Sequence, residues 1–214
     1  MSKKKADPTI VPMLTILNAA YTEAVKLFPE KAQREALSRQ RPLIVIQHGG
    51  RRKKRLYGWH ANRRWKRGKD EIDEITLTAE ALSQGYYDAM DTLVHEMVHH
   101  ANHLLGVEDC TANGYHNRKF AVLAEAVGLT VKKMGRHGFA QTVVSPEFKA
   151  TVDGWGFDKK AFDMYRTKEP GIGKGSKLKK WSCKCGYGIR IAVTQRHEVD
   201  LTCGVCGSKV TKKE

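Results

Sequence analysis

The sequence has no long hydrophobic run: its longest apolar stretches hold about five residues, whereas a membrane-spanning helix needs about 20. No apolar stretch ending in small residues follows the basic start at residues 1–8, so we expect neither a secretory signal nor a membrane anchor. Cysteine is scarce, with five residues in 214, which excludes a small disulfide scaffold. Hydrophobic residues still make up 41% of the chain, enough for a core. We therefore expect a folded protein of a reducing compartment, either the cytoplasm, with or without nucleoid association, or a eukaryotic nucleus.

Positive charge is in excess and is unevenly distributed. The chain has 38 Lys+Arg against 23 Asp+Glu, a formal net charge of +15, and residues 49–69 hold ten basic residues and no acid. Residues 70–109 invert this pattern, with ten acids and no Lys or Arg. Either the two segments neutralise each other as neighbouring strands, or the basic segment contacts the phosphate backbone of DNA. The candidates for nucleic-acid contact are Arg51, Arg52, Lys53, Lys54, Arg55, Arg63, Arg64, Lys66 and Arg67.

Hydrophobic periodicity divides the chain into two parts. It predicts helices over 9–28, 86–105 and 117–127, strands over 43–46 and 72–78, and no clear element between 131 and 165. The basic segment after the first strand reads as a hairpin or an extended arm. Residues 167–180 are rich in Gly and Lys and have nothing to bury, which is typical of a linker. We therefore expect one domain over 1–166 and a small one over 181–210.

The predicted helix over 86–105 contains the pattern H-E-x-x-H as His95, Glu96 and His99. Two histidines four residues apart lie on one face of a helix, about 6 Å apart along its axis, so both imidazoles can reach one Zn²⁺. Glu96 is then placed beside the ion, where a carboxylate can take a proton from a zinc-activated water. We expect Glu96 to be the general base of a hydrolytic zinc site.

A catalytic zinc needs a third protein ligand and an open fourth position. Asn102 and Leu105 stand where a metzincin would have Gly and His, which excludes that subclass. Glu108 and Glu125 are available as carboxylate ligands, but His116 is the better candidate, since a short loop can bring it back to the helix over 86–105. His100 points away from the His95–His99 pair, and His103 lies too far along the helix axis from His95. We expect neither of them to bind the ion.

Four of the five cysteines form two close pairs near the C-terminus. Cys183 and Cys185 make a C-x-C turn, Cys203 and Cys206 make a C-x-x-C turn, and each pair is followed by Gly. Four thiolates at such spacing are typical of a closed tetrahedral zinc site. About 30 residues cannot build a core, so we expect the ion to supply most of the folding free energy of this zinc ribbon.

Three of these motifs together resemble the SprT-like family of zinc metallopeptidases, whose eukaryotic relative is Spartan. The likeness rests on residues 75–77, on residues 92–99 around H-E-x-x-H, and on Gly114-Tyr115-His116 with Phe120. It spans roughly residues 40–130 and the ribbon, where bacterial SprT proteins are similar to this chain in having C-x-C. The resemblance implies an α+β, zincin-like domain with a small sheet packed on the motif helix, followed by the ribbon. It also implies that His95, His99 and His116 bind zinc.

These observations favour an intracellular zinc metalloendopeptidase with two zinc ions, one catalytic and one structural. The family's link to the repair of DNA–protein crosslinks implies a protein substrate held on or near DNA, contacted through residues 49–69. The alternative is a nucleic-acid-binding zinc-ribbon protein with a weak or vestigial peptidase site. The charge asymmetry favours this alternative, whereas the presence of Glu96 argues against it, because a dead site has no need of the base.

Overall fold

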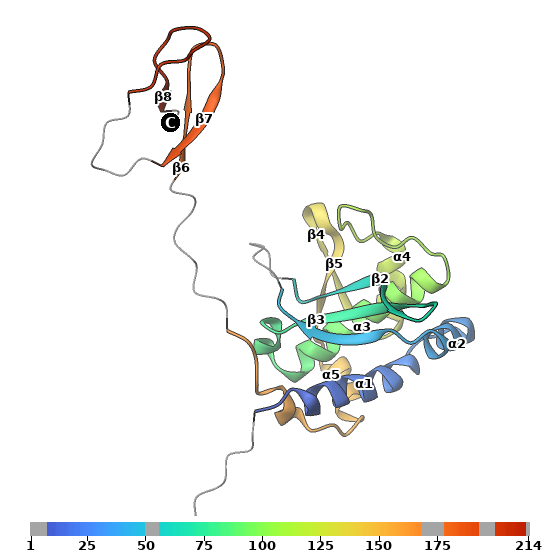
Figure 1. The fold of residues 1–214 in the computed structure, drawn as a ribbon. Coiled ribbons are helices and arrows are strands. Elements are labelled where there is room, and N and C mark those ends of the chain that lie inside the picture. The colour runs from blue at the N-terminus through green and yellow to red at the C-terminus, as the bar shows by residue number, and fades with distance from the viewer. Residues whose placement is uncertain (1–7, 50–55, 168–177, 193–199, 213–214) are drawn as a thin grey trace, which may run out of the picture. The chain divides into compact units, whose positions relative to one another are not determined.

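The computed structural model describes residues 8–49, 56–167, 178–192 and 200–212, and the chain divides into two compact units, Met1–Thr167 and Lys168–Glu214 (Figure 1). Most of the expected linker, residues 168–177, lies outside the described residues. The first unit is a mixed α+β structure and the second is a small sheet. No helix among the described residues is both long and apolar enough to span a membrane.

The main sheet of the first unit has three strands in the order β1-β3-β2. Its central strand β3 (Asp70–Thr78) runs parallel to β1 (Leu43–Gln47) and antiparallel to β2 (Gly58–Arg67). The basic segment therefore enters the sheet as an edge strand. The pairing of β2 with β3 is interrupted by a bulge between Ala61 and Trp65, where Arg63 has a φ of 51°.

Helix α3 (Tyr86–Leu104) carries the H-E-x-x-H motif and packs against strands β2 and β3 (Figure 1). It also contacts α1 (Val11–Val25), α2 (Lys31–Arg39) and α4 (Arg118–Ala126). Several of its side chains are fully buried, namely Met90, Leu93, Val94, Met97, Val98 and Ala101. A helix enclosed on several sides is held firmly, which fixes the positions of its motif side chains.

The segment with no clear sequence pattern forms a hairpin followed by a short helix. Strands β4 (Thr130–Met134) and β5 (Gly138–Val143) pair antiparallel around η2 (Gly135–His137) and contact α4. Helix α5 (Pro146–Asp153) begins at Ser145, whose hydroxyl accepts a hydrogen bond from the Phe148 N–H. The 3₁₀ turns η1 (Ala81–Gln84) and η3 (Lys159–Phe162) complete the unit.

The second unit is a three-stranded antiparallel sheet. Its strands β6 (Leu178–Ser182), β7 (Gly188–Ala192) and β8 (Thr211–Lys212) lie in the order β7-β6-β8. Cys183 and Cys185 follow β6, and Cys203 and Cys206 precede β8. The only buried residue of this unit in the described segments is Cys183. Its stability must therefore come from something other than a hydrophobic core.

Candidate metal centre

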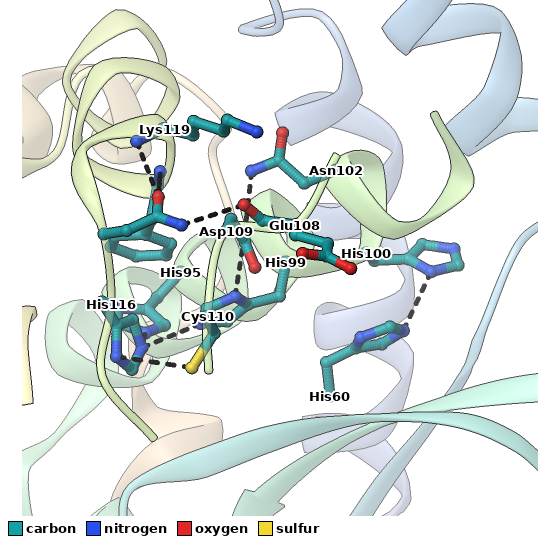
Figure 2. Close-up of polar contacts among 12 residues, drawn as sticks. His60, His95, His99, His100, Asn102, Glu108, Asp109, Cys110, His116 and Lys119 are labelled. Carbon is teal, nitrogen blue, oxygen red and sulfur yellow. Dashed lines mark hydrogen bonds and ion pairs between the residues drawn. The ribbon is translucent and has the colours of Figure 1, made fainter. Parts of the chain in front are cut away.

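The structure brings His95, His99 and His116 together with their Nε2 atoms facing one another (Figure 2). The Nε2 of His116 lies 3.3 Å from that of His95 and 2.9 Å from that of His99. Zinc–nitrogen bonds of 2.0–2.1 Å in tetrahedral geometry separate ligand nitrogens by roughly 3.4 Å. The three nitrogens are therefore spaced as ligands of one zinc ion, and three protein ligands leave a fourth position open.

Backbone hydrogen bonds on both sides hold His116 in this position. Its N–H donates to the carbonyl oxygen of His137 at 3.1 Å, and its carbonyl oxygen accepts from the N–H of Phe139 at 3.0 Å. Gly138 lies between these two partners with a φ of +64°, and a Cβ there would overlap the carbonyl oxygen of His116. Glycine is therefore required where β5 begins, and this close approach delivers the third histidine to the helix.

A carboxylate orients His99 from outside the cluster. The Nδ1–H of His99 donates to Oδ2 of buried Asp109 at 2.9 Å, and the amide of Asn102 donates to the same oxygen at 2.8 Å. In a neutral ring with its proton on Nδ1, the lone pair lies on Nε2 and points toward His116. The Nδ1 of His116 similarly faces the carbonyl oxygen of Gly114 at 3.3 Å.

A hydroxyl relay orients His95 in the same sense. Thr142 on β5 donates its hydroxyl hydrogen to Oδ2 of Asp91 at 2.5 Å, so its oxygen can accept from the Nδ1–H of His95 at 3.4 Å. Burial raises the pKa of Asp91 to about 6, and its Oδ1 has no hydrogen-bond partner among the described residues. All three rings therefore direct Nδ1 outward and present Nε2 lone pairs to a common point, an arrangement that repels unless a cation lies there.

The surroundings of the cluster are apolar and favour neutral rings. The fully buried ring of Phe120 lies with its centroid 4.6 Å from those of His95 and His99 and 4.7 Å from that of His116. Burial and the charge of neighbouring histidines lower the pKa of His95, and lower that of His116 to about 4. Burial opposes ionisation of His99 as well, but the hydrogen bond to Asp109 and the charge of Glu96 raise its pKa. This partner makes His99 the most basic of the three nitrogen ligands.

Glu96 lies on α3 beside the cluster and is 6% exposed. Burial raises the pKa of Glu96 to about 7, against the opposing effects of His99 and of a hydrogen bond from the backbone of His60. Strand β2 passes close above it, since a Cβ on Gly58 would lie 3.3 Å from Cγ of Glu96 and 2.6 Å from the carbonyl oxygen of Thr76. A carboxyl group with a pKa near neutrality can both accept and return a proton.

No protein-family model, curated protein or solved structure matches the chain. The chemistry is therefore argued from the atoms of the site. Sequence reasoning did not find Asp109, Thr142 or Asp91. Asp109 lies in the short loop between the motif helix and His116, and Asp91 lies on the motif helix itself, four residues before His95. Thr142 lies on β5, and no pattern in the sequence links it to the motif.

The remaining sequence candidates lie outside the cluster. Glu108 and Glu125, the alternative third ligands, are exposed. Cys110, the one cysteine outside the two C-terminal pairs, has its Sγ 3.9 Å from Nδ1 of His116. His100 and His103 both lie near Asp73 and the ring of His60, in a different group of side chains. A cavity of about 360 Å³ is lined by residues of α2, α3 and α4, and none of the three histidines or Glu96 contributes to that lining.

In the second unit, the four cysteine sulfurs lie within 4.8 Å of one another. Sγ of Cys185 is 3.0 Å from that of Cys183 and 3.7 Å from that of Cys203. Zinc–sulfur bonds of 2.3 Å in tetrahedral geometry separate ligand sulfurs by roughly 3.8 Å. Hydrogen bonds with Ser208 lower the pKa of Cys206 to about 6, whereas hydrogen bonds with Cys183 and Cys206 raise the pKa of Cys185. The donor set fits a closed structural zinc site.

The basic residues are only partly within the described chain. Four of them, Arg63, Arg64, Lys66 and Arg67, lie exposed along β2. Glu71 is 3.5 Å from Arg63 and 3.9 Å from Lys66, while Arg67 is 3.8 Å from Asp70. The acids of β3 thus balance part of this charge, as the first interpretation of the charge pattern expects. Outside the described residues lie Arg51, Arg52, Lys53, Lys54 and Arg55.

Proposed function

We propose that this protein is a zinc-dependent endopeptidase of the SprT-like type, with a zincin-like catalytic unit and a zinc ribbon. The observation that carries the proposal is the convergence of three imidazole Nε2 atoms beside the buried carboxyl group of Glu96. Three neutral nitrogen donors suit Zn²⁺, and the open fourth position distinguishes a catalytic site from a structural one. The four cysteines of the second unit are proposed to hold the structural zinc.

We assign the side chains of the site different roles in peptide hydrolysis. His95, His99 and His116 would hold a zinc ion, which would supply Lewis-acid polarisation of a carbonyl group and of a water molecule. Glu96 is placed to accept a proton from water and to return it to the leaving amine. Asp109 and Thr142 keep the rings of His99 and His95 turned toward the ion.

The proposed substrate is a protein bound to DNA. This part of the proposal is supported by the net charge of +15 and by the basic segment at 49–69, whose described part forms the edge strand β2. Nucleic acid would compete with Glu71 and Asp70 for the basic side chains of β2. DNA contact would place the catalytic unit next to its substrates and raise their local concentration.

The decisive comparison is between wild type and Glu96→Gln, both as full chains loaded with zinc. Incubation with an unstructured protein substrate, followed by electrophoresis, is expected to show cleavage by wild type and a rate lowered about 10²–10⁴-fold in the variant. The exposed Glu125→Gln is the matched control and should cleave at the wild-type rate. Glu96→Gln with normal zinc content and normal cleavage would contradict the proposal.

A separate experiment tests the contact with DNA. Arg63, Arg64, Lys66 and Arg67 are replaced together by Gln, and binding to a duplex is measured over a series of salt concentrations. We expect weaker binding and a less steep salt dependence, because fewer counterions are released. Binding of unchanged strength and unchanged salt dependence would remove these four residues from the nucleic-acid interface.

A further inference from the structure

A second group of nitrogen and oxygen donors lies beside the cluster of His95, His99 and His116, on a neighbouring face of α3. It consists of His60 on β2, Asp73 on β3 and His100 on α3, and their donor atoms all lie within 4.8 Å of one another. Figure 2 shows His60 and His100 pointing toward each other, away from His116. None of the three belongs to the cluster of His95, and all three side chains are at most 12% exposed.

The three donor atoms form a nearly equilateral triangle. Nε2 of His60 lies 3.2 Å from Nδ1 of His100 and 3.5 Å from Oδ2 of Asp73, and Nδ1 of His100 lies 3.3 Å from the same oxygen. The centre of such a triangle is roughly 1.9 Å from each corner, close to the 2.0–2.2 Å of zinc–nitrogen and zinc–oxygen bonds. The spacing is that of three ligands around one ion.

Hydrogen bonds outside the triangle orient its donors inward. Nε2 of His100 donates to the carbonyl oxygen of Gln40 at 2.8 Å, which in a neutral ring leaves the lone pair on Nδ1. Oδ1 of Asp73 accepts the backbone N–H of Arg63 at 2.7 Å, so Oδ2 is left to face the two rings.

Without a cation, hydrogen bonds satisfy at most two of the three contacts in the triangle. Nδ1 of His100 and Nε2 of His60 can each carry a proton and donate it to Oδ2 of Asp73, and one contact is then left with either no hydrogen or two. His103 stands on the more exposed side, with Nε2 3.8 Å from the same Asp73 oxygen. One turn of α3 thus supplies His100 and His103 three residues apart on a shared face, as a pair of ligands requires.

We propose that His60, Asp73 and His100 bind a further divalent transition-metal ion of the zinc type. His103 lies outside this group, with Nε2 3.8 Å from the Asp73 oxygen, and would turn toward the ion as the fourth ligand. An ion held by side chains of three separate elements has a structural role. It joins β2, β3 and α3, three elements distant in sequence. The backbone of His60 also hydrogen-bonds to Glu96, so the ion braces the strand that positions this carboxyl group. The binding itself does not depend on the proposed peptidase activity.

The test counts metal ions in the full chain. Protein saturated with zinc and then desalted is expected to hold three zinc ions per chain, by elemental analysis. His60→Gln and Asp73→Asn each retain the shape of the side chain and should lower the count to two, as should His116→Ala. Combining Asp73→Asn with His116→Ala should leave one ion, that of the cysteines. His48→Gln, a histidine outside all three groups, is the matched control and should keep three.

Because Asp73 and His60 are largely enclosed, far-UV circular dichroism must show that the variants are folded. If those variants are not folded, His103→Ala replaces them in the test, since it removes a more exposed side chain. We expect His103→Ala to weaken the binding of one zinc ion at least tenfold. Wild type with two ions, reduced to one by His116→Ala and unchanged by Asp73→Asn, would overturn the proposal. So would three ions in His60→Gln and Asp73→Asn alike. An inactive wild type with three ions would refute the peptidase and leave this site standing.

Discussion

Replacing Asp109 should weaken zinc binding at the His95–His99–His116 cluster in a graded way. Oδ2 of Asp109 accepts hydrogen bonds from His99 at 2.9 Å and from Asn102 at 2.8 Å. In Asp109→Asn the amide oxygen can still accept both bonds but carries no charge, so the loss is that of a charge-assisted bond becoming neutral, about 1–1.5 kcal/mol. This corresponds to about a tenfold weaker zinc affinity. Asp109→Ala removes the acceptor as well, and we expect a loss near 100-fold.

The assay is equilibrium dialysis against a series of buffered free-zinc concentrations, with zinc per chain measured at each. The step that disappears in His116→Ala belongs to the three-histidine cluster, and its midpoint gives the affinity. Glu108→Gln, an exposed acid next to Asp109, is the matched control for the change in net charge. An unchanged midpoint in Asp109→Ala, or an equal shift in Glu108→Gln, would refute the idea that Asp109 orients His99.

Three further changes test other parts of the structure. Gly138→Ala should lower the free energy of unfolding in urea by about 2 kcal/mol or more and weaken zinc binding at His116, because the new Cβ overlaps the His116 carbonyl oxygen. Gly156→Ala has a similar φ of +72° but open space, so an equal loss in both variants would contradict this explanation. Burial raises the pKa of Asp91 to about 6, so ionisation of this side chain in the folded protein lowers the free energy of unfolding. This loss is absent below pH 4 and complete above pH 6. The stability of Asp91→Asn relative to wild type should therefore rise by about 2–3 kcal/mol between pH 4 and pH 7.5, and a difference independent of pH would count against the raised pKa. Cys203→Ser should remove one zinc ion and expose residues 178–212 to proteolysis while the urea midpoint of the first unit stays unchanged; a ribbon that resists protease without zinc would contradict its dependence on the ion.

The parts of the fold that the sequence predicts well are those with strong periodicity. The helix expected over 86–105 is observed as Tyr86–Leu104, because its apolar stripe is continuous and Gly106, with a φ of +69°, follows its end. Helix α2 was not predicted, since its polar sequence buries little besides Ala36 and Leu37. The hairpin of β4 and β5 was ambiguous because most of β4 is exposed, so no alternation of apolar residues marks it.

In the candidate site too, the residues that are close in sequence could be predicted, and those brought together by the tertiary fold could not. His95, Glu96 and His99 are adjacent on one helix, so their spacing alone predicts a shared ion. His116 reaches them only through bridges to residues 110 and 138, which depend on the tertiary fold. The group of His60, Asp73 and His100 comes from three elements, and no sequence pattern indicates that they meet. His100 lies outside the group of His95, His99 and His116, as expected from the sequence.

The most direct test of the proposed metal centre is anomalous X-ray scattering at the zinc edge from crystals of the full chain grown with zinc. The account predicts three peaks: one about 2 Å from the Nε2 atoms of His95, His99 and His116, one among the four cysteine sulfurs, and one among His60, Asp73 and His100. A peak at the cysteines with none at the three histidines would contradict a catalytic zinc site beside Glu96.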